Sequence, residues 1–237
     1  MTFFQQSALL LTAIWLVTVV VRFRRSSIVL IGGLFALAAY TLAAFADGKV
    51  TPDELGLGPA RSWLQTVGFA MAGLAVMVAY SPLADRLASR LFTAPPTLEA
   101  FAAIQQSRLK LIAGVAAAWM LRGFLEELVA RGIVLSSVET LLSTWIAPPV
   151  ATGAAICIAA LGAGAMHSYQ GARAAAIITQ LSVLFGILFV ASGYNLWAVM
   201  LCHGLYDTIA FVRFATRRSK YSHLDQVQVP SDIPRNG

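Results

Sequence analysis

The sequence contains few charged residues for its length. Asp, Glu, Lys and Arg make up 12% of the 237 residues, whereas apolar residues make up 58%. A soluble domain has about 25% charged residues, so this composition excludes an ordinary water-soluble protein. Several apolar runs approach or reach the roughly 20 residues that a helix needs to cross the hydrocarbon core of a bilayer. We therefore predict an all-α fold, a polytopic bundle of transmembrane helices.

Cysteine is also scarce, and basic residues outnumber acidic ones. Cys157 and Cys202 both lie in apolar runs without the spacing of a metal site or a disulfide framework, so we expect packed free thiols. The 17 Lys and Arg residues exceed the 11 Asp and Glu residues and give a formal charge of +6. In a membrane protein this excess is typical of cytoplasmic loops. We therefore expect no nucleic-acid partner.

Apolar segments that can cross a membrane recur seven times along the chain. The first is too long for the core of a signal peptide and lacks a basic start, so we interpret it as a spanning helix. No internal repeat links the segments. The predicted spans are residues 4–21, 27–46, 63–82, 111–138, 150–168, 172–191 and 194–214.

Lys and Arg residues predict the orientation of these spans. They follow the first, third, fifth and seventh segments, whereas the connections on the opposite side contain only Lys49 and Arg61. Because positive residues are retained in cytoplasmic loops, the N-terminus is predicted to lie outside and the C-terminus in the cytoplasm. The connection formed by residues 85–110 is expected to place an amphipathic helix at the membrane interface.

The fourth segment contains four charged residues, Arg122, Glu126, Glu127 and Arg131. Each charge at the centre of a spanning helix costs about 2.5–3.5 kcal/mol, so this helix must face protein or a water-filled cavity. The i,i+4 spacing allows Arg122 to pair with Glu126, and Glu127 with Arg131, which would neutralise the charges without any function. The alternative is a functional site, because ionisable residues inside a membrane are usually functional.

Two histidines and an aspartate in later segments favour the functional alternative. His167 ends the fifth segment, and His203 and Asp207 lie one helical turn apart in the seventh. A carboxylate beside a histidine can remove a proton from water, and a second histidine can stabilise an oxyanion. Together with Glu126 and Glu127, these residues suit the hydrolysis of an amide.

Three motifs of the chain resemble those of the CAAX protease and bacteriocin-processing (CPBP) family of intramembrane glutamic endopeptidases. The family motifs are Glu-Glu-x-x-x-Arg, Phe-x-x-x-His and His-x-x-x-Asn or Asp, in this order. Ala163 stands at the phenylalanine position, which is a departure from the family pattern. The residues that match are Glu126, Glu127, Arg131, His167, His203 and Asp207.

The resemblance implies an enzyme that hydrolyses a peptide bond, and it implies a role for each matching residue. An ionised Asp207 cannot donate a hydrogen bond to an oxyanion. It is therefore either protonated or orients His203, which is the interpretation we prefer. No cofactor is expected, although zinc stays open. The implied roles are water activation for Glu126 and His167, oxyanion stabilisation for His203 and Asp207, and support of the site for Glu127 and Arg131.

Sequence content and the resemblance together divide the chain into three parts. Residues 1–109 are expected to form N-terminal transmembrane helices and an interfacial segment, residues 110–214 the catalytic helical core, and residues 215–237 a polar, poorly ordered cytoplasmic tail. The expected location is the inner (cytoplasmic) membrane of the cell. The expected partners are membrane lipid and a peptide or protein substrate that is membrane-associated, prenylated or sorting-tagged.

Three other functions use the same residues. A zinc-dependent membrane protease would take His167, His203 and a glutamate as ligands, but the chain lacks the sequence His-Glu-x-x-His. A proton-coupled transporter would also bury Glu and His residues, but the inverted repeats of many transporters are not seen in this sequence. A non-catalytic scaffold would bind membrane partners without turning over a substrate.

Overall fold

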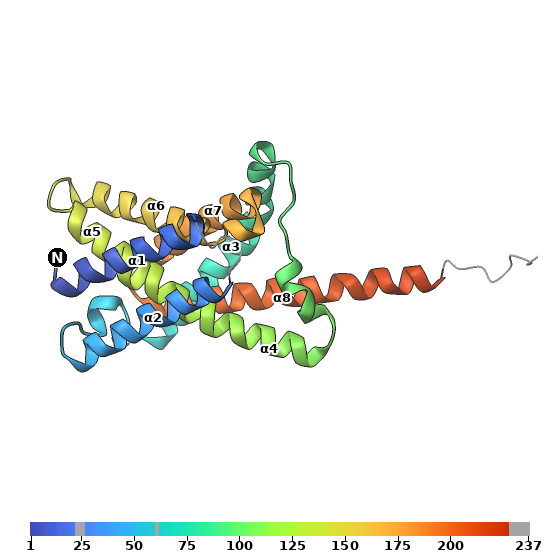
Figure 1. Cartoon of the computed structure of the whole chain (residues 1–237), viewed down its shortest axis with the longest axis horizontal. Helices are drawn as coiled ribbons and strands as arrows, with labels where there is room; N and C mark the ends of the chain where they lie inside the picture. The colour runs from blue at the N-terminus through green and yellow to red at the C-terminus, as the bar shows by residue number, and fades with distance from the viewer. Residues whose placement is uncertain (22–26, 60–61, 228–237) are drawn as a thin grey trace, which may run out of the picture.

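The described part of the chain is built from helices, as predicted (Figure 1). The structure is a computed structural model that describes residues 1–21, 27–59 and 62–227, and within these ranges no strand occurs. Three short 3₁₀ helices, η1 (Asp53–Leu55), η2 (Glu99–Gln105) and η5 (Ser168–Gln170), lie in connections. The α-helices are α1 (Phe3–Val21), α2 (Ser27–Ala46), α3 (Trp63–Leu91), α4 (Arg108–Ala118), α5 (Ser136–Leu142), α6 (Pro148–Met166), α7 (Ala172–Ala191) and α8 (Leu196–Val227).

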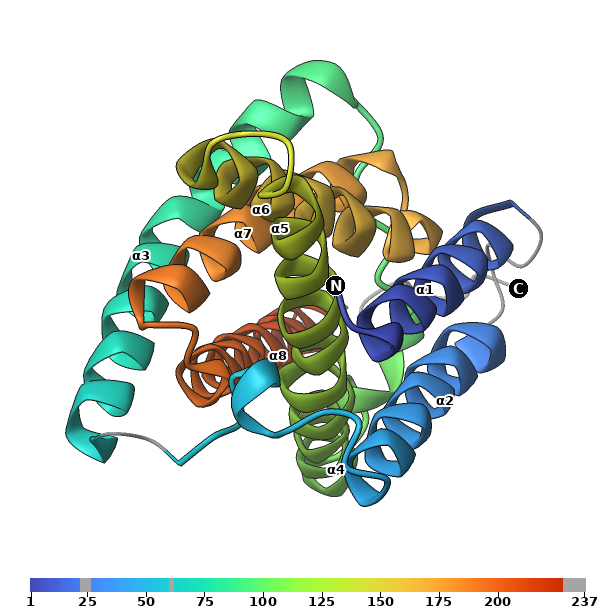
Figure 2. The same ribbon diagram turned by 90° about the vertical axis from the view of Figure 1, so that its left-hand side faces the viewer.

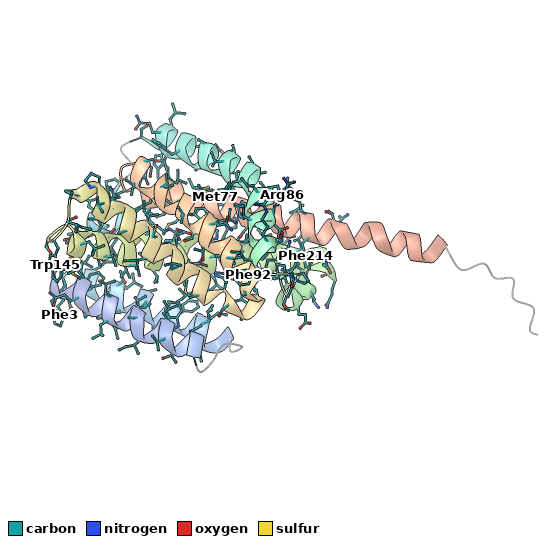
Figure 3. All side chains as sticks on the ribbon, turned by 90° about the horizontal axis from the view of Figure 1, so that it is seen from above. Phe3, Met77, Arg86, Phe92, Trp145 and Phe214 are labelled. Carbon is teal, nitrogen blue, oxygen red and sulfur yellow. The ribbon has the colours of Figure 1, made fainter. Side chains whose placement is uncertain are left out.

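Five of these helices are long and apolar enough to cross a membrane, so the chain is a multi-pass membrane protein. They are α2, α3, α6, α7 and the first part of α8, residues Leu196–Thr216. Helix α1 is apolar but shorter by this measure, over Phe3–Val19. Large apolar side chains cover the outside of the bundle, as a lipid-facing surface requires. They include Phe3 and Trp145 at one end of the bundle and Phe92 toward the other (Figure 3).

Local sequence signals set several helix boundaries. Ser62 accepts a hydrogen bond from the backbone N–H of Gln65 at the start of α3, and Ser107 accepts one from Lys110 at the start of α4. Helix α6 begins at Pro148, whose missing N–H costs nothing in the first turn. Gly171 precedes α7 with a φ of +100°, a conformation that side chains disfavour.

The charged segment lies in the middle of the bundle (Figure 2). Between α4 and α5 it continues as two π-helical stretches, η3 (Trp119–Glu126) and η4 (Leu128–Leu135). Helices α1 and α2 lie on one side of it, α7 and α8 lie on the other, and α6 packs along η4. Almost every residue of η4 is buried. The burial follows from the charges, because lipid cannot solvate them and neighbouring helices can.

Two helices extend beyond the predicted boundaries. Helix α3 passes through Pro82 and ends at Leu91, because Ala84 and Ala88 are still buried against the bundle and Asp85 forms an ion pair with Arg173 of α7. Helix α8 continues past the predicted end of the last span at residue 214, as far as Val227. Residues 228–237 lie outside the described ranges. In the 85–110 connection, η2 follows the end of α3.

The crossing of α6 and α7 depends on a glycine, which provides a test of the fold. A Cβ atom on Gly164 would lie 1.9 Å from Oγ1 of Thr179 and 2.8 Å from the carbonyl oxygen of Ala175. Gly164→Ala should therefore destabilise the protein by about 1–3 kcal/mol through overpacking, and thermal unfolding in detergent should show a lower midpoint.

Gly153 provides the matched control on the same helix. A Cβ atom there meets nothing within 4 Å. Gly153→Ala should therefore leave the midpoint unchanged or raise it, since alanine in a helix interior is favoured over glycine by about 0.5–1 kcal/mol. Equal shifts for the two variants would contradict this account of the helix crossing.

Candidate active site

The six residues predicted to form the site come together from three parts of the bundle. The structure places them at the junction of η3 and η4, at the end of α6, and on α8. All six are buried, with exposed fractions between 0 and 5%. They are Glu126, Glu127, Arg131, His167, His203 and Asp207.

The two adjacent glutamates point to different partners. Glu126 ends η3 and Glu127 joins it to η4, so both lie in a stretch whose backbone hydrogen bonds have the wider π-helical spacing. Such stretches occur frequently at functional sites. Glu126 lies near His167 of the α6 end, whereas Glu127 contacts His203 of α8. The site therefore has two halves, one around each glutamate.

The half around Glu127 is closed by hydrogen bonds. Oε1 of Glu127 accepts from Nδ1 of His203 at 2.5 Å and from Nη1 of Arg131 at 3.2 Å. Nη2 of Arg131 donates to the carbonyl oxygen of Ser182 at 2.8 Å and to its hydroxyl at 2.6 Å. The Phe185 ring stacks on His203 with 4.6 Å between centroids, and the Arg131 guanidinium lies 5.3 Å from the same ring. These contacts tie η4, α7 and α8 together.

The hydrogen bond to Glu127 orients the His203 ring. A carboxylate only accepts, so Nδ1 of His203 carries the hydrogen of this bond. The ring then turns Nε2 toward Asp207, whose Oδ2 is 3.7 Å away. This distance is too long for a direct hydrogen bond. Orientation of His203 by hydrogen bonding, which we preferred to assign to Asp207, is provided by Glu127 in the structure.

The half around Glu126 leaves room between its groups. Nδ1 of His167 donates to the carbonyl oxygen of Ala163 at 2.8 Å, which turns Nε2 toward Oε2 of Glu126 at 3.9 Å. A gap of this size allows one water molecule to contact both atoms. A cavity of about 50 Å³ adjoins Glu126 and has Arg122, His203 and Asp207 in its wall. This space is large enough to hold water among polar groups.

Arg122 belongs to the same cluster, although the sequence placed it only as a partner of Glu126. Its Nε is 3.9 Å from Oε2 of Glu126, but its Nη1 lies 3.1 Å from Oδ2 of Asp207 and its Nη2 lies 3.2 Å from Nε2 of His167. The i,i+4 rule considers only the partner on the same helix. The long guanidinium reaches across to α8 and to the end of α6.

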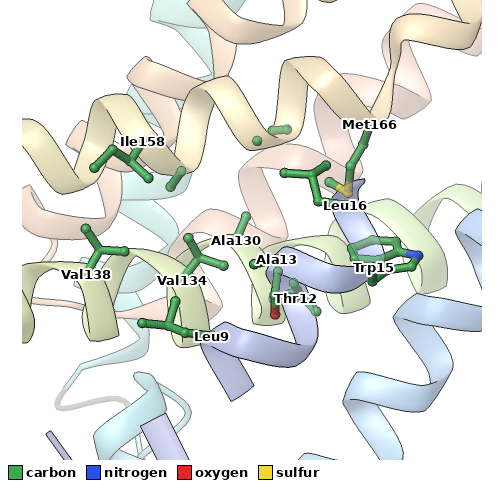
Figure 4. A pocket seen from close by; sticks show the side chains of 14 residues that line it. Leu9, Thr12, Ala13, Trp15, Leu16, Ala130, Val134, Val138, Ile158 and Met166 are labelled. Carbon is green, nitrogen blue, oxygen red and sulfur yellow. The ribbon is translucent and has the colours of Figure 1, made fainter. Parts of the chain in front are cut away.

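A second, apolar cavity lies on the other side of the charged segment (Figure 4). It measures about 180 Å³ and is lined by side chains of α1, η4, α5 and α6, among them Leu9, Val134 and Met166. Ala163 is part of its wall. The small side chain at this position, where the family has phenylalanine, therefore lies against open apolar space on the helical turn that carries His167.

The cysteines and the metal-ligating residue types do not add a further site to this region. Both cysteines are free; Cys157 is exposed and Cys202 is buried. Among residues 1–21, 27–59 and 62–227, no group of three or more His, Cys, Asp or Glu side chains is arranged so that it could hold a metal ion.

Comparison with protein families gives one match. Residues 108–209 match the family model described as type II CAAX prenyl endopeptidase Rce1-like. The matched range includes all three motifs, and it confirms the resemblance to CAAX proteases that the motifs indicated. The comparisons with curated proteins and with solved structures gave no match.

The ion pair between Glu127 and Arg131 should be essential for folding. Arg131→Met would leave the Glu127 carboxylate buried without its cation, and removing one partner of a buried pair costs about 3–5 kcal/mol. We expect a large drop in the midpoint of thermal unfolding in detergent. The double variant Glu127→Gln/Arg131→Met removes the stranded charge and should be more stable than Arg131→Met alone.

The exposed end of the bundle offers a matched control for this experiment. Arg173 donates to both carboxylate oxygens of Asp85, but the Asp85 side chain is 49% exposed. Arg173→Met should therefore cost no more than about 1 kcal/mol. If Arg173→Met lost as much stability as Arg131→Met, burial of the ion pair would not determine the free-energy cost of removing its arginine.

Proposed function

Because residues 108–209 belong to the Rce1-like family of CAAX endopeptidases, we propose that the chain is an intramembrane glutamic endopeptidase. One observation carries the proposal: the Glu126 carboxylate, which borders a cavity, lies 3.9 Å from Nε2 of the buried His167. The match to a protease family and the arrangement of Glu126 and His167 both support hydrolysis of a peptide bond.

In the proposed reaction, Glu126 and His167 hold and activate a water molecule. Glu126 takes a proton from the water, and the water oxygen bonds to the carbonyl carbon of the peptide bond. The carbonyl oxygen becomes an oxyanion. When the C–N bond breaks, Glu126 returns its proton to the leaving amine, so that a carboxylic acid and an amine are formed. A positioned general base contributes about 10²–10⁴-fold to such a rate.

The oxyanion is proposed to form on the side of His203 and Asp207. His203 borders the cavity, and its Nε2 donates to an oxyanion when both ring nitrogens carry hydrogens. Glu127 and Arg131 support this arrangement, because their contacts fix the His203 ring and join η4 to α7. Asp207 borders the same cavity.

The helices suggest how the site lies in the membrane. We propose that seven segments cross it, with α1 and the continuous segment from α4 to α5 added to the five long apolar helices. The site then lies within the bundle, in a core formed by residues 110–214, with residues 1–109 as supporting helices and residues 215–237 as a cytoplasmic tail. The distribution of Lys and Arg supports an outside N-terminus in the cytoplasmic membrane. Lipid and a membrane-associated peptide or protein are the proposed partners.

Glu126→Gln is the direct test of the proposed function. Gln keeps the shape of the side chain but cannot accept the proton, so the rate should fall about 10²–10⁴-fold. The measurement maps new peptide termini by mass spectrometry in native membranes that contain the wild type or the variant. Glu99→Gln, on the exposed η2, makes the same chemical change outside the site and should give the wild-type set of termini.

Two outcomes would go against proteolysis. If wild type and Glu126→Gln yield the same termini, the chain does not hydrolyse peptide bonds through Glu126. If the variant nevertheless loses a wild-type phenotype that depends on ion flux, the transporter alternative gains support; if it keeps a phenotype that depends on partner binding, the scaffold alternative does.

Removal of metal separates the glutamic mechanism from the zinc alternative. Hydrolysis through Glu126 and His167 needs no Lewis acid, so the rate at which wild-type-dependent termini appear should stay unchanged after treatment with 1,10-phenanthroline. A zinc protease would stop, and added zinc would restore it. Loss of activity with recovery on zinc would therefore replace the glutamic mechanism.

A further inference from the structure

Asp207 presents a problem for the oxyanion site. Its side chain is buried, with 3% exposed, and it shares the cavity wall with His203 and Glu126. A carboxylate has no hydrogen to donate, and a negative charge beside a forming oxyanion raises the barrier. The site needs a positive donor at this position if Asp207 is ionised.

Arg122 is the positive group that meets this need. Its Nη1 lies 3.1 Å from Oδ2 of Asp207, and its Nη2 lies 3.2 Å from Nε2 of His167. The guanidinium therefore bridges the residue that accompanies the attacking water and the residue beside the oxyanion. Its side chain is 23% exposed and forms part of the cavity wall.

One N–H group of the Arg122 guanidinium donates no hydrogen bond to any residue that the structure describes. Arginine carries five N–H hydrogens, which no single carboxylate can satisfy. Nε of Arg122 is buried, and among the described residues it has no hydrogen-bond partner. The closest carboxylate oxygen, Oε2 of Glu126, is 3.9 Å away. A buried N–H without a partner costs free energy until a group arrives to accept from it.

We infer that Arg122 is a catalytic residue that donates to the oxyanion, and that Asp207 is the positioning residue that holds it. The inference rests on the proposed function. Asp207 pairs with Nη1 of the guanidinium, which forms part of the cavity wall, and the charge that develops on the carbonyl oxygen is stabilised there in a low-dielectric surrounding. In the ground state Nη2 donates to Nε2 of His167, so the arginine already stands beside the site of attack.

The test removes Arg122 in two backgrounds. Arg122→Gln alone should slow the appearance of wild-type-dependent termini by about 10²–10³-fold, as expected for loss of an oxyanion donor. This variant also strands the Asp207 charge, so the decisive comparison is made in the Asp207→Asn background, where no carboxylate needs to be neutralised. The double variant Arg122→Gln/Asp207→Asn should still be at least about tenfold slower than Asp207→Asn alone. The midpoint of thermal unfolding should be the same for these two variants.

Each result has one meaning. If Arg122→Gln has no effect on the rate in the Asp207→Asn background, the arginine only balances the charge of Asp207 and the inference is wrong. If Glu126→Gln gives the same termini as the wild type, the proposed function itself fails, and the role of Arg122 with it. If Arg122→Gln/Asp207→Asn is slower than Asp207→Asn and Glu126→Gln is inactive, the results support both the proposed function and the role of Arg122.

The Arg173–Asp85 pair is the matched control. It also joins an arginine to an aspartate of another helix, with N–O distances of 2.9 and 2.8 Å, but it lies away from the cavity. Arg173→Gln, alone or with Asp85→Asn, should leave the rate within about twofold of the wild type, as expected for a partly exposed pair. A loss like that of Arg122→Gln would point to a general effect on the bundle.

Discussion

Neutralisation of charge inside an apolar bundle is the constraint on which this structure depends. The helical segment in the middle of the bundle carries two arginines and two glutamates, and lipid cannot solvate these charges. Each of these charges finds its partners on other helices: His203 and Asp207 on α8, His167 at the end of α6, and Ser182 on α7. The central position of η3 and η4, and the order in which α6, α7 and α8 pack around them, follow from that requirement.

The same requirement is met in two different ways on the two sides of the segment. Arg131 makes hydrogen bonds to Glu127 and Ser182 and is 1% exposed, so this side resembles a structural ion pair. Arg122 is 23% exposed and has looser contacts, with its Nε 3.9 Å from Glu126, although both arginines border the cavity and have an Nε without a hydrogen-bond partner in the described part of the chain. Buried polar groups that are incompletely satisfied are unfavourable for stability. Such atoms occur on both sides among the described residues: Nε of Arg122 and Oδ2 of Asp207 on one, Oε2 of Glu127 and Nε of Arg131 on the other.

Of the seven spans that the sequence predicted, five are confirmed as helices long and apolar enough to cross a membrane, because hydropathy alone sets them. The sequence also predicted which six residues meet, since the motifs and the cost of buried charge both point to them. It failed where packing between helices decides: Pro82 does not end α3, because Ala84 and Ala88 continue to pack against the bundle. Helical spacing paired Arg122 with Glu126. Its closer contacts on α8 and α6 depend on how the helices cross, which one sequence does not contain.

Charge counting connects the architecture with the chemistry. The cluster holds two guanidinium groups, of Arg122 and Arg131, and three carboxylates, so it carries one negative charge when both histidines are neutral. A low-dielectric interior disfavours an unbalanced charge, and one proton on the cluster removes it. A site that is balanced by a single proton can accept that proton from water and give it to a leaving amine without burying a second net charge. The arginine beside Asp207 thus belongs to the same balance that keeps the helix folded in the membrane.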